Sequence, residues 1–305
     1  MAGPRAAGRL FSRRAQVKPK LIPSPFISGM NVFKSLPDPR YYQIVVLSSL
    51  LVFGVFVLDF GIHGYNALAI ITSAQLVQFF CMRISGVAPF DPLSAAITSL
   101  SLTLLLRTDT VAIAVVAACI AIGSKFVLRA RGKHIFNPAN IALVTLMFCS
   151  DNAWVSSGQW GSAAIGAFTL ACLGFLVLTR ARRAETTIAF LLAYAALMTG
   201  RALWLGDPLS IPLHQLQNGA LLIFAFFMIS DPKTTPNRSG TRILYGVLVA
   251  SVAYVIQFVF YEPNAPIIAL ILSAPLVPVF DWIMRGPSYR WKSPAAGRTG
   301  YFKGV

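Results

Sequence analysis

The most informative segment of the chain is Phe227-Met228-Ile229-Ser230-Asp231-Pro232-Lys233-Thr234-Thr235-Pro236. It ends an apolar run of about 20 residues, the length of a membrane-spanning helix, with an acid, two prolines, a lysine and two threonines. Pro232 cannot continue a helix, and it disfavours the helical conformation at Asp231. The chain therefore breaks where the run reaches the membrane surface, or just inside it. Such a break is either an ordinary loop or a site buried in protein or beside a wet cavity.

The composition is that of a membrane protein. The chain has 305 residues, of which 56% are hydrophobic and 12% are charged, and its mean hydropathy is +0.68. Soluble proteins carry about a quarter charged residues. The net charge of +16 does not indicate nucleic-acid binding, because the basic residues lie in short segments between apolar runs.

Ten apolar segments predict an all-α polytopic protein with about ten transmembrane helices. They are roughly 41–60, 65–82, 91–106, 110–129, 137–149, 160–179, 187–204, 213–230, 241–260 and 265–283. We expect a membrane domain over 41–283, a basic cytoplasmic N-terminal tail over 1–40 without a cleavable signal, and a basic cytoplasmic C-terminal tail over 284–305.

Lysine and arginine predict the orientation. With ten helices, 24 of the 26 basic residues fall on one face, and only Arg107 and Arg201 fall on the other. Basic residues concentrate on the cytoplasmic side of membrane proteins. We therefore expect an even number of spans with both termini cytoplasmic, and the bacterial cytoplasmic membrane as the location.

Two short segments open alike. One begins Asp91-Pro92-Leu93-Ser94 and the other Asn137-Pro138-Ala139-Asn140. Asp or Asn suits the N-cap of a helix, and proline suits its first turn. Because these helices are short, we expect them to begin below the cytoplasmic surface and to face a cavity.

Both openings are echoed in the second half of the chain. Asp207–Ser210 precedes the eighth segment as Asp91–Ser94 opens the third, and Asn264–Leu270 opens the tenth as Asn137–Leu143 opens the fifth. Each echo joins segments that are five apart, an odd number, so the two copies have opposite orientations. The pattern predicts a five-plus-five inverted repeat, in which interrupted helices indicate the binding site.

The expected inner face gathers polar groups that suit a phosphate or the polar edge of a ring. The group consists of Asp91, Ser94, Thr98, Lys125, Asn137, Asn140, Asp231, Lys233, Thr234 and Thr235. All but Asn140 are our predicted cofactor-binding residues. Five phenylalanines nearby are expected to contact a flat ring, or else lipid and core: Phe136, Phe148, Phe224, Phe226 and Phe227. A flavin fits this combination, as does another anionic or planar ligand.

No catalytic constellation is present in the sequence. It has no serine–histidine–acid arrangement, zinc motif or Walker loop, so it leaves open whether the chain is an enzyme. The four cysteines, Cys81, Cys119, Cys149 and Cys172, lie in apolar runs and never as a C-x-x-C pair. We interpret them as small buried hydrophobes and predict no metal site.

The chain resembles the RnfD/NqrB family, the flavin-carrying membrane subunits of Rnf and sodium-pumping NADH:quinone oxidoreductase complexes. The resemblance covers about residues 40–283 and rests on Phe90–Thr98, Gly132–Ala139 and Phe227–Pro236. It implies an inverted pair of five-helix units, in agreement with the repeat. Trp154–Ser162 and Arg201–Pro208 resemble the RnfD-like proteins encoded in enediyne biosynthesis clusters.

One departure bears on the cofactor. Flavinylated members of the family attach FMN to the threonine of a Ser/Asp-Gly-Ala-Thr motif, and this chain has no Gly-Ala-Thr triplet. We therefore expect no covalent FMN, while a non-covalent flavin, FMN or riboflavin, stays open.

Three functions fit these observations. The first is a membrane subunit of an electron-transport complex, with the lipid bilayer and other redox subunits as partners. The second is a transporter or channel for a small solute, or an exporter of a secondary metabolite. The third is a scaffold that keeps the fold without a cofactor.

Overall fold

The computed structural model describes residues 38–86, 90–155, 174 and 184–287. The sixth predicted segment, 160–179, lies outside these residues except for Gly174, and so do Cys172, nearly all of the N-terminal tail and most of the C-terminal tail. The described part is mainly helical, which confirms the all-α prediction. Its helices are α1 (Pro39–Phe56), α2 (Gly64–Ile84), α3 (Pro92–Leu105), α4 (Val111–Val127), α5 (Pro138–Cys149), α7 (Ala184–Leu205), α8 (Ser210–Leu216), α9 (Gly219–Ile223), the π-helix η2 (Phe224–Met228), α10 (Ser239–Val259), α11 (Ala265–Ser273) and α12 (Leu276–Ile283).

The protein is an integral membrane protein. Four helices, α1, α2, α7 and α10, are long and apolar enough to cross a bilayer. Two bent pairs, α8 with α9–η2 at 51° and α11 with α12 at 48°, raise the number of candidate spans in the described residues to six. The apolar helices α3, α4 and α5 are shorter.

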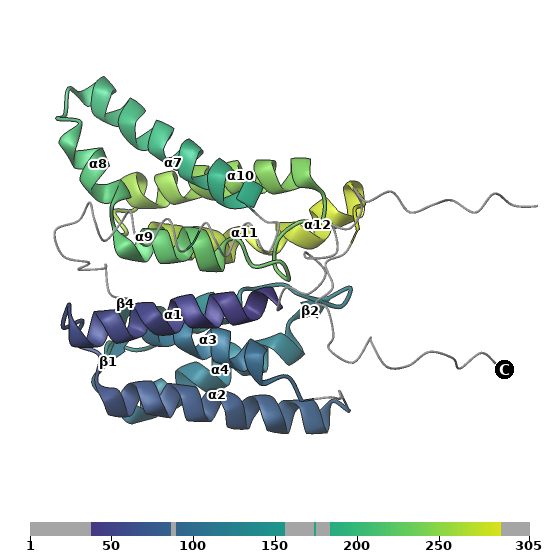
Figure 1. Ribbon diagram of the computed structural model, residues 1–305. Helices are drawn as coiled ribbons and strands as arrows, with labels where there is room; N and C mark the ends of the chain where they lie inside the picture. The colour runs from purple at the N-terminus through teal and green to yellow at the C-terminus, as the bar shows by residue number, and fades with distance from the viewer. Residues whose placement is uncertain (1–37, 87–89, 156–173, 175–183, 288–305) are drawn as a thin grey trace, which may run out of the picture. The chain divides into compact units, whose positions relative to one another are not determined.

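The described helices form two groups. In the first, α2 packs against α3 and α4, α1 against α3, and α4 against α5. In the second, α10 packs against α7 and α11 (Figure 1). The groups meet where α5 contacts α11, and there the Asn140 side chain donates a hydrogen bond to the Ile267 carbonyl at 3.1 Å. A continuous apolar core runs through both groups and includes Leu102, Leu143 and Tyr245, all fully buried.

Short extended segments follow three helices, and the sequence did not indicate them. Strand β1 (Leu106–Thr108) continues from α3 and pairs antiparallel with β4 (Ala153–Val155), which follows α5. Strands β2 (Arg129–Ala130) and β3 (Lys133–His134) form a hairpin after α4.

Arg107 holds the end of α3. Its guanidinium donates to the carbonyls of Thr103 and Leu104, each at 3.2 Å, and to Phe60 at 3.0 Å in the segment after α1. The last carbonyls of a helix have no partner within it. A planar guanidinium with five N–H groups satisfies several of them at once, so this cation is structural.

The helix starts follow the predicted caps in part. Asn137 caps α5, because its side-chain oxygen accepts from the Asn140 N–H at 3.1 Å. Asp38 caps α1 by accepting from the Arg40 N–H at 3.0 Å, so α1 begins inside the region expected to be tail. Asp91 occupies the N-cap position of α3 but makes no capping bond. The prediction of a capping carboxylate was wrong there, because Arg40 binds both of its oxygens.

The eighth and tenth segments are not single helices, as 213–230 and 265–283 predicted. Helix α8 ends at Leu216, and α9 restarts after Asn218, whose side chain accepts from the Ala220 N–H at 2.9 Å. Helix α11 ends before the turn at Pro275 that begins α12. Proline has no N–H to continue the helical ladder, and this accounts for the second break.

The wide turn η2 follows α9 directly. The Ile229 N–H donates to the Phe224 carbonyl at 3.0 Å, five residues back. The Thr187 hydroxyl of α7 donates to the Ala225 carbonyl at 2.6 Å, so a neighbouring helix satisfies an acceptor of the widened turn. Single π turns of this kind occur frequently at functional sites.

The described cysteines correct another expectation. Cys119 and Cys149 are exposed on apolar helices, and Cys81 is half-buried. They were predicted to be buried because apolar runs were read as core. A helix in a bilayer instead exposes apolar side chains to lipid. A cysteine side chain is a small hydrophobic group, so it suits that environment as well.

Candidate ligand pocket

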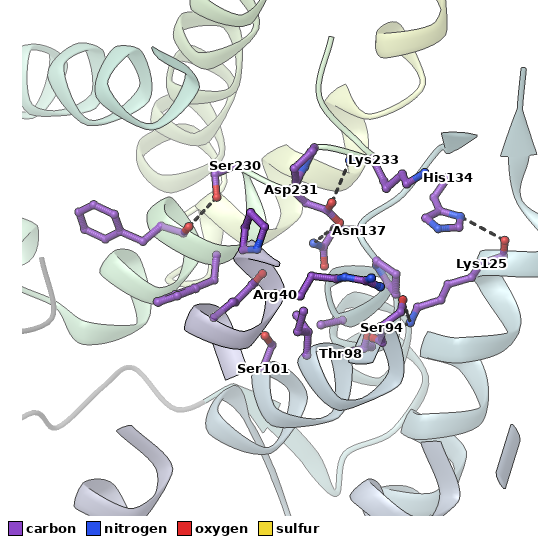
Figure 2. A pocket seen from close by; sticks show the side chains of 18 residues that line it. Arg40, Ser94, Thr98, Ser101, Lys125, His134, Asn137, Ser230, Asp231 and Lys233 are labelled. Atoms are coloured by element: carbon purple, nitrogen blue, oxygen red, sulfur yellow. Dashed lines mark hydrogen bonds between the residues drawn. The ribbon is translucent and has the colours of Figure 1, made fainter. Parts of the chain in front are cut away.

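A hollow of about 70 Å³ lies where α1, α3 and α5 begin and where α4 and η2 end. We call it the lysine pocket. Figure 2 shows its side chains converging from both helix groups. The polar residues that line it are Arg40, Gln43, Ser94, Thr98, Ser101, Lys125, His134, Asn137, Ser230, Asp231 and Lys233.

Six of the nine predicted cofactor-binding residues line the lysine pocket: Ser94, Thr98, Lys125, Asn137, Asp231 and Lys233. The other three lie beside it with different partners. Asp91 binds Arg40, while the hydroxyls of Thr234 and Thr235 donate back to the Asp231 carbonyl at 3.4 and 3.0 Å. Those two hydroxyls close the turn and do not face the hollow.

Arg40 enters the pocket from the start of α1, and its charge is matched by two acids. Its guanidinium lies 2.8 Å from the Asp38 carboxylate and 2.7 Å from the Asp91 carboxylate. Arg40 is 7% exposed. A buried charge is stable only when it is paired and hydrogen-bonded, so Asp38 and Asp91 serve this guanidinium and fix α1 against α3.

Lys125 differs, because it makes no ion pair with a carboxylate in the described part of the chain. It is 4% exposed, and its Nζ donates to the Ser94 carbonyl at 3.0 Å and to the Ser94 hydroxyl at 3.2 Å. An ammonium has three donors, and both of these partners are neutral. At least one N–H of Lys125 is therefore left to donate to an anion or an electronegative atom in the pocket.

The Asp231 turn forms the opposite wall. One carboxylate oxygen accepts from the Lys233 N–H at 2.9 Å, and the other lies 3.5 Å from the Asn137 amide nitrogen. The Asp231 carbonyl accepts from the N–H groups of Thr234 and Thr235, each at 3.1 Å. Pro232 lies within this tight turn. The break expected between Phe227 and Pro236 therefore exists, and hydrogen bonds from the hydroxyl and amide groups of the turn stabilise it.

Burial sets the protonation of the groups around this turn. Burial raises the pKa of Asp231, and the Lys233 N–H with the nearby lysines acts in the opposite direction. Burial lowers the pKa of Lys233, and Asp231 opposes that effect. Burial, together with the nearby cations Lys125, Arg129 and Lys233, lowers the pKa of His134 to about 3.

His134 is thus a neutral polar group at physiological pH. Its Nδ1 lies 3.1 Å from the Lys125 carbonyl. A carbonyl only accepts, so the ring proton is on Nδ1, and Nε2 is an acceptor. The sequence placed His134 in a basic loop, and it did not indicate that the β2–β3 hairpin folds back onto the pocket.

Two of the phenylalanines considered as ring contacts, Phe226 and Phe227, line the pocket. Phe224 is fully buried and faces a different cavity. Phe148 is 68% exposed, and Phe136 is half-buried. Among the described residues, the aromatic side chains that reach this hollow therefore come from η2.

Asn140 lies one turn below Asn137 on α5. It is 1% exposed, its amide nitrogen binds Ile267 of α11, and its amide oxygen has no hydrogen-bond partner in the described residues. A buried acceptor without a partner costs about 1–3 kcal/mol. Asn140 is not among the residues that line the lysine pocket.

Comparisons with known proteins bear on the second half of the chain. The family model described as the NQR2, RnfD, RnfE family matches residues 153–290. The resemblance to the RnfD/NqrB family is confirmed over these residues. They include the Asp231 turn of the lysine pocket, whereas Phe90–Thr98 and Gly132–Ala139 lie outside the match.

Curated proteins of the family give the same relationship. The chain is 26% identical over 137 residues to the RnfD subunit of the ion-translocating oxidoreductase complex of Citrobacter koseri, which is 45% of this chain and 35% of that protein. It is 32% identical over 110 residues to the corresponding protein of Erwinia tasmaniensis, 35% of this chain and 31% of that protein. The chain thus matches about a third of the length of these RnfD relatives.

Proposed function

We propose that this chain is an RnfD/NqrB-like membrane subunit of an electron-transport complex, working beside other redox subunits in the bilayer. The observation that carries the proposal is the buried Lys125, which has no carboxylate partner among the described residues. It lies in a polar pocket whose other wall, the Asp231 turn, belongs to the region matching the family. The matched relatives are named as subunits of an ion-translocating oxidoreductase complex.

The topology we propose has ten spans in a five-plus-five inverted repeat, with both termini cytoplasmic in the bacterial cytoplasmic membrane. The positions of the irregular segments support it. The third and fifth segments are short helices continued by β1 and β4, and the eighth and tenth are the bent pairs. The irregular members thus recur five segments apart. Tags at the two ends that become accessible from opposite sides of the membrane would refute this arrangement.

The ligand we propose for the lysine pocket is anionic or planar, with a non-covalent flavin as the leading case. Lys125 and the Ser94 hydroxyl fit a phosphate or the polar edge of a ring. A volume of about 70 Å³ is several times the roughly 10–15 Å³ that one water needs. It is smaller than a whole flavin, so only part of that cofactor fits the described hollow.

The experiment is purification of the full chain in mild detergent, followed by absorption spectroscopy and chromatography of the released flavin. We expect a non-covalent flavin in the wild type and less of it in Lys125→Met. The matched control is Arg83→Gln, an exposed cation on α2. A colourless protein, prepared gently enough to retain loose cofactor, would contradict the flavin proposal.

A second candidate function is a transporter for a small solute or an exporter of a secondary metabolite. The observation that favours it is the pair of bent helices in the second group, because interrupted helices are typical of transporter binding sites. Flux into proteoliposomes tests it, with empty vesicles as the baseline. A scaffold without a cofactor would instead tolerate Asp231→Asn and Lys233→Met with no loss beyond folding.

A further inference from the structure

An open groove of about 500 Å³ runs along the surface of α7 near the end of that helix, and α10 forms its other edge. We call it the α7 groove. It shares no lining residue with the lysine pocket, so what binds here is independent of the flavin proposed there. The lining residues that carry the argument are Ala196, Leu197, Gly200, Arg201, Trp204 and Tyr254.

The groove lies at the level where two spanning helices reach the membrane surface. Helices α7 and α10 are each long and apolar enough to cross a bilayer. Arg201 lies in the last turn but one of α7, and its guanidinium lies 4.2 Å from the centroid of the Phe258 ring, in the last turn of α10. Trp204 is 88% exposed. Tryptophan and arginine at a helix end are typical of the interface between hydrocarbon and headgroups, so the groove opens onto the headgroups.

The two charges at the groove have unused hydrogen-bonding capacity. The Arg201 guanidinium lies 3.7 Å from the Asp207 carboxylate, and the side chains are 35% and 40% exposed. That distance is longer than a hydrogen bond, and neither side chain makes one to another residue in the described part of the chain. A guanidinium has five N–H donors, and a carboxylate has about four acceptor sites. Both groups are therefore left to bind the charged parts of a ligand.

The backbone holds Asp207 beside Arg201 without help from the ion pair. Gly206 has φ +76°, a left-handed conformation that glycine adopts readily. The Asp207 N–H then donates to the Ala202 carbonyl at 2.8 Å, which closes the end of α7. An exposed ion pair contributes only about 0.2–1 kcal/mol. A ligand can thus insert its own charges between the two side chains while the turn stays closed.

The other cation on this side of the predicted topology is already occupied. Arg107 is 7% exposed, and its N–H groups donate to backbone carbonyls at the end of α3 and at Phe60. Of the two arginines that the ten-span arrangement places opposite the basic face, Arg201 is therefore the one with donors left for a phosphate.

The rest of the groove is apolar and lies along the helix, away from the charges. Ala196 and Gly200 are one turn apart, so they share a face of α7. A Cβ added at Gly200 would have no atom within 4 Å in the described residues. Leu197 and Tyr254 add apolar surface. This leaves room for a hydrocarbon chain that enters the bilayer from a headgroup held at Arg201.

We propose that the α7 groove binds a phospholipid with a phosphoethanolamine headgroup. Its phosphate accepts hydrogen bonds from Arg201, its ammonium donates to Asp207, and one acyl chain lies over Gly200. A two-carbon link joins the two charges of this headgroup, which suits protein charges that lie side by side. A phosphoglycerol lipid would bring an anion to Asp207 without an ammonium, and a phosphocholine lipid has no N–H to donate.

The test is a titration of the full-length protein, purified in mild detergent, by native mass spectrometry. The probes are dioleoyl lipids with phosphoethanolamine, phosphocholine and phosphoglycerol headgroups, so that the acyl chains are matched. We expect the phosphoethanolamine lipid to bind about three- to tenfold more tightly than either of the others. Tenfold corresponds to about 1.4 kcal/mol, slightly less than a charged hydrogen bond in a protein.

Three variants locate the site, and each has a different signature. Arg201→Gln should weaken the phosphoethanolamine lipid about tenfold. Asp207→Asn should weaken that lipid but strengthen the phosphoglycerol lipid, since the arginine then has no competing carboxylate. Gly200→Leu fills the groove, so it should weaken all three lipids. The matched control is Arg83→Gln, which removes an exposed arginine over the Phe79 ring near the end of α2 and should change nothing.

Four results would overturn the proposal. They are equal binding of the three headgroups, unchanged phosphoethanolamine binding in Arg201→Gln, an unchanged lipid preference in Asp207→Asn, and a lipid-free dimer that Gly200→Leu dissociates. The last result would mean that a second copy of the chain covers the groove. Melting curves and gel filtration of each variant separate loss of the site from loss of the fold. Failure here leaves the flavin measurement standing, since that experiment reads the lysine pocket.

Discussion

Replacing Asp281 with alanine should weaken the attachment of α12 to the hairpin after α4 and to the segment before α10. The Asp281 carboxylate lies 2.9 Å from the Lys133 ammonium and accepts from the Asn237 N–H at 2.7 Å. The two charged side chains are only 10% and 17% exposed. Lys133 lies on the hairpin after α4, and Asn237 lies just before α10, so one carboxylate ties the two helix groups together.

The magnitude follows from what each group loses. Breaking a buried ion pair costs about 3–5 kcal/mol, because the remaining charge stays buried. Lys133 keeps two neutral partners, the Thr235 carbonyl at 2.6 Å and the Asn237 side chain at 3.2 Å, which reduces the loss. The Asn237 N–H loses a charged acceptor, a bond worth about 1.5–3 kcal/mol. We therefore expect Asp281→Ala to lower the free energy of unfolding by about 2–4 kcal/mol.

The assay is reversible unfolding in mixed micelles, followed by far-ultraviolet circular dichroism as the fraction of denaturing detergent rises. Asp281→Asn is the matched control, since it keeps the shape and one acceptor oxygen, and it should lose less. A double-mutant cycle with Lys133→Met should give a coupling free energy of about 1–3 kcal/mol. A loss below about 0.5 kcal/mol, as at exposed ion pairs, would refute the reasoning.

Three further predictions use the same assay. Gly246→Ala should lower the free energy of unfolding by about 1–3 kcal/mol, because an added Cβ would lie 2.6 Å from the Thr186 carbonyl. Gly200→Ala, with open space around it, should be neutral or stabilising by up to about 1 kcal/mol. Equal losses in the two variants would contradict the close α7–α10 packing. Arg107→Lys should cost about 1–3 kcal/mol, since one ammonium cannot reproduce the bonds of the planar fork to both Phe60 and the end of α3; an unchanged stability would argue against its structural role. The pKa of His134 is about 3 in the folded state and about 6.5 when unfolded, so between these values the unfolded chain binds one more proton. The free energy of unfolding should therefore fall by up to about 1.4 kcal/mol per pH unit as the pH drops below 6.5. His134→Gln should flatten that slope, and an unchanged slope would contradict the assignment.

Local signals in the sequence predicted much of the pocket. Asn137 followed by proline was sufficient to predict the cap of α5, because capping depends on residues within one turn. Asp231-Pro232 likewise predicted a break. Lys125 could be predicted as a binding residue because few cations lie near the end of an apolar run.

The missing parts depend on contacts between distant residues. Arg40 read as the end of a basic tail, and its partner Asp91 lies 51 residues away. The same pairing took Asp91 away from its predicted capping role. The break at Asn218 was hidden because an apolar average over twenty residues does not register one polar residue that restarts a helix, although Asn-Gly is a turn signal in its own right.

The phenylalanines of the wide turn η2 line different cavities. Phe224 at its start borders a second cavity, between α7, α8, α9, α10 and α11, while Phe226 and Phe227 border the lysine pocket. The five-residue turn takes up one residue more than an α turn, so deleting a single residue here would restore ordinary helical winding and leave Asp231 in register. A deletion in the regular helix α9 would instead rotate everything that follows by about 100° and carry Asp231 away from Asn137 and Lys125. Between Asn218 and Asp231, a single-residue deletion should therefore be tolerated best within η2 itself.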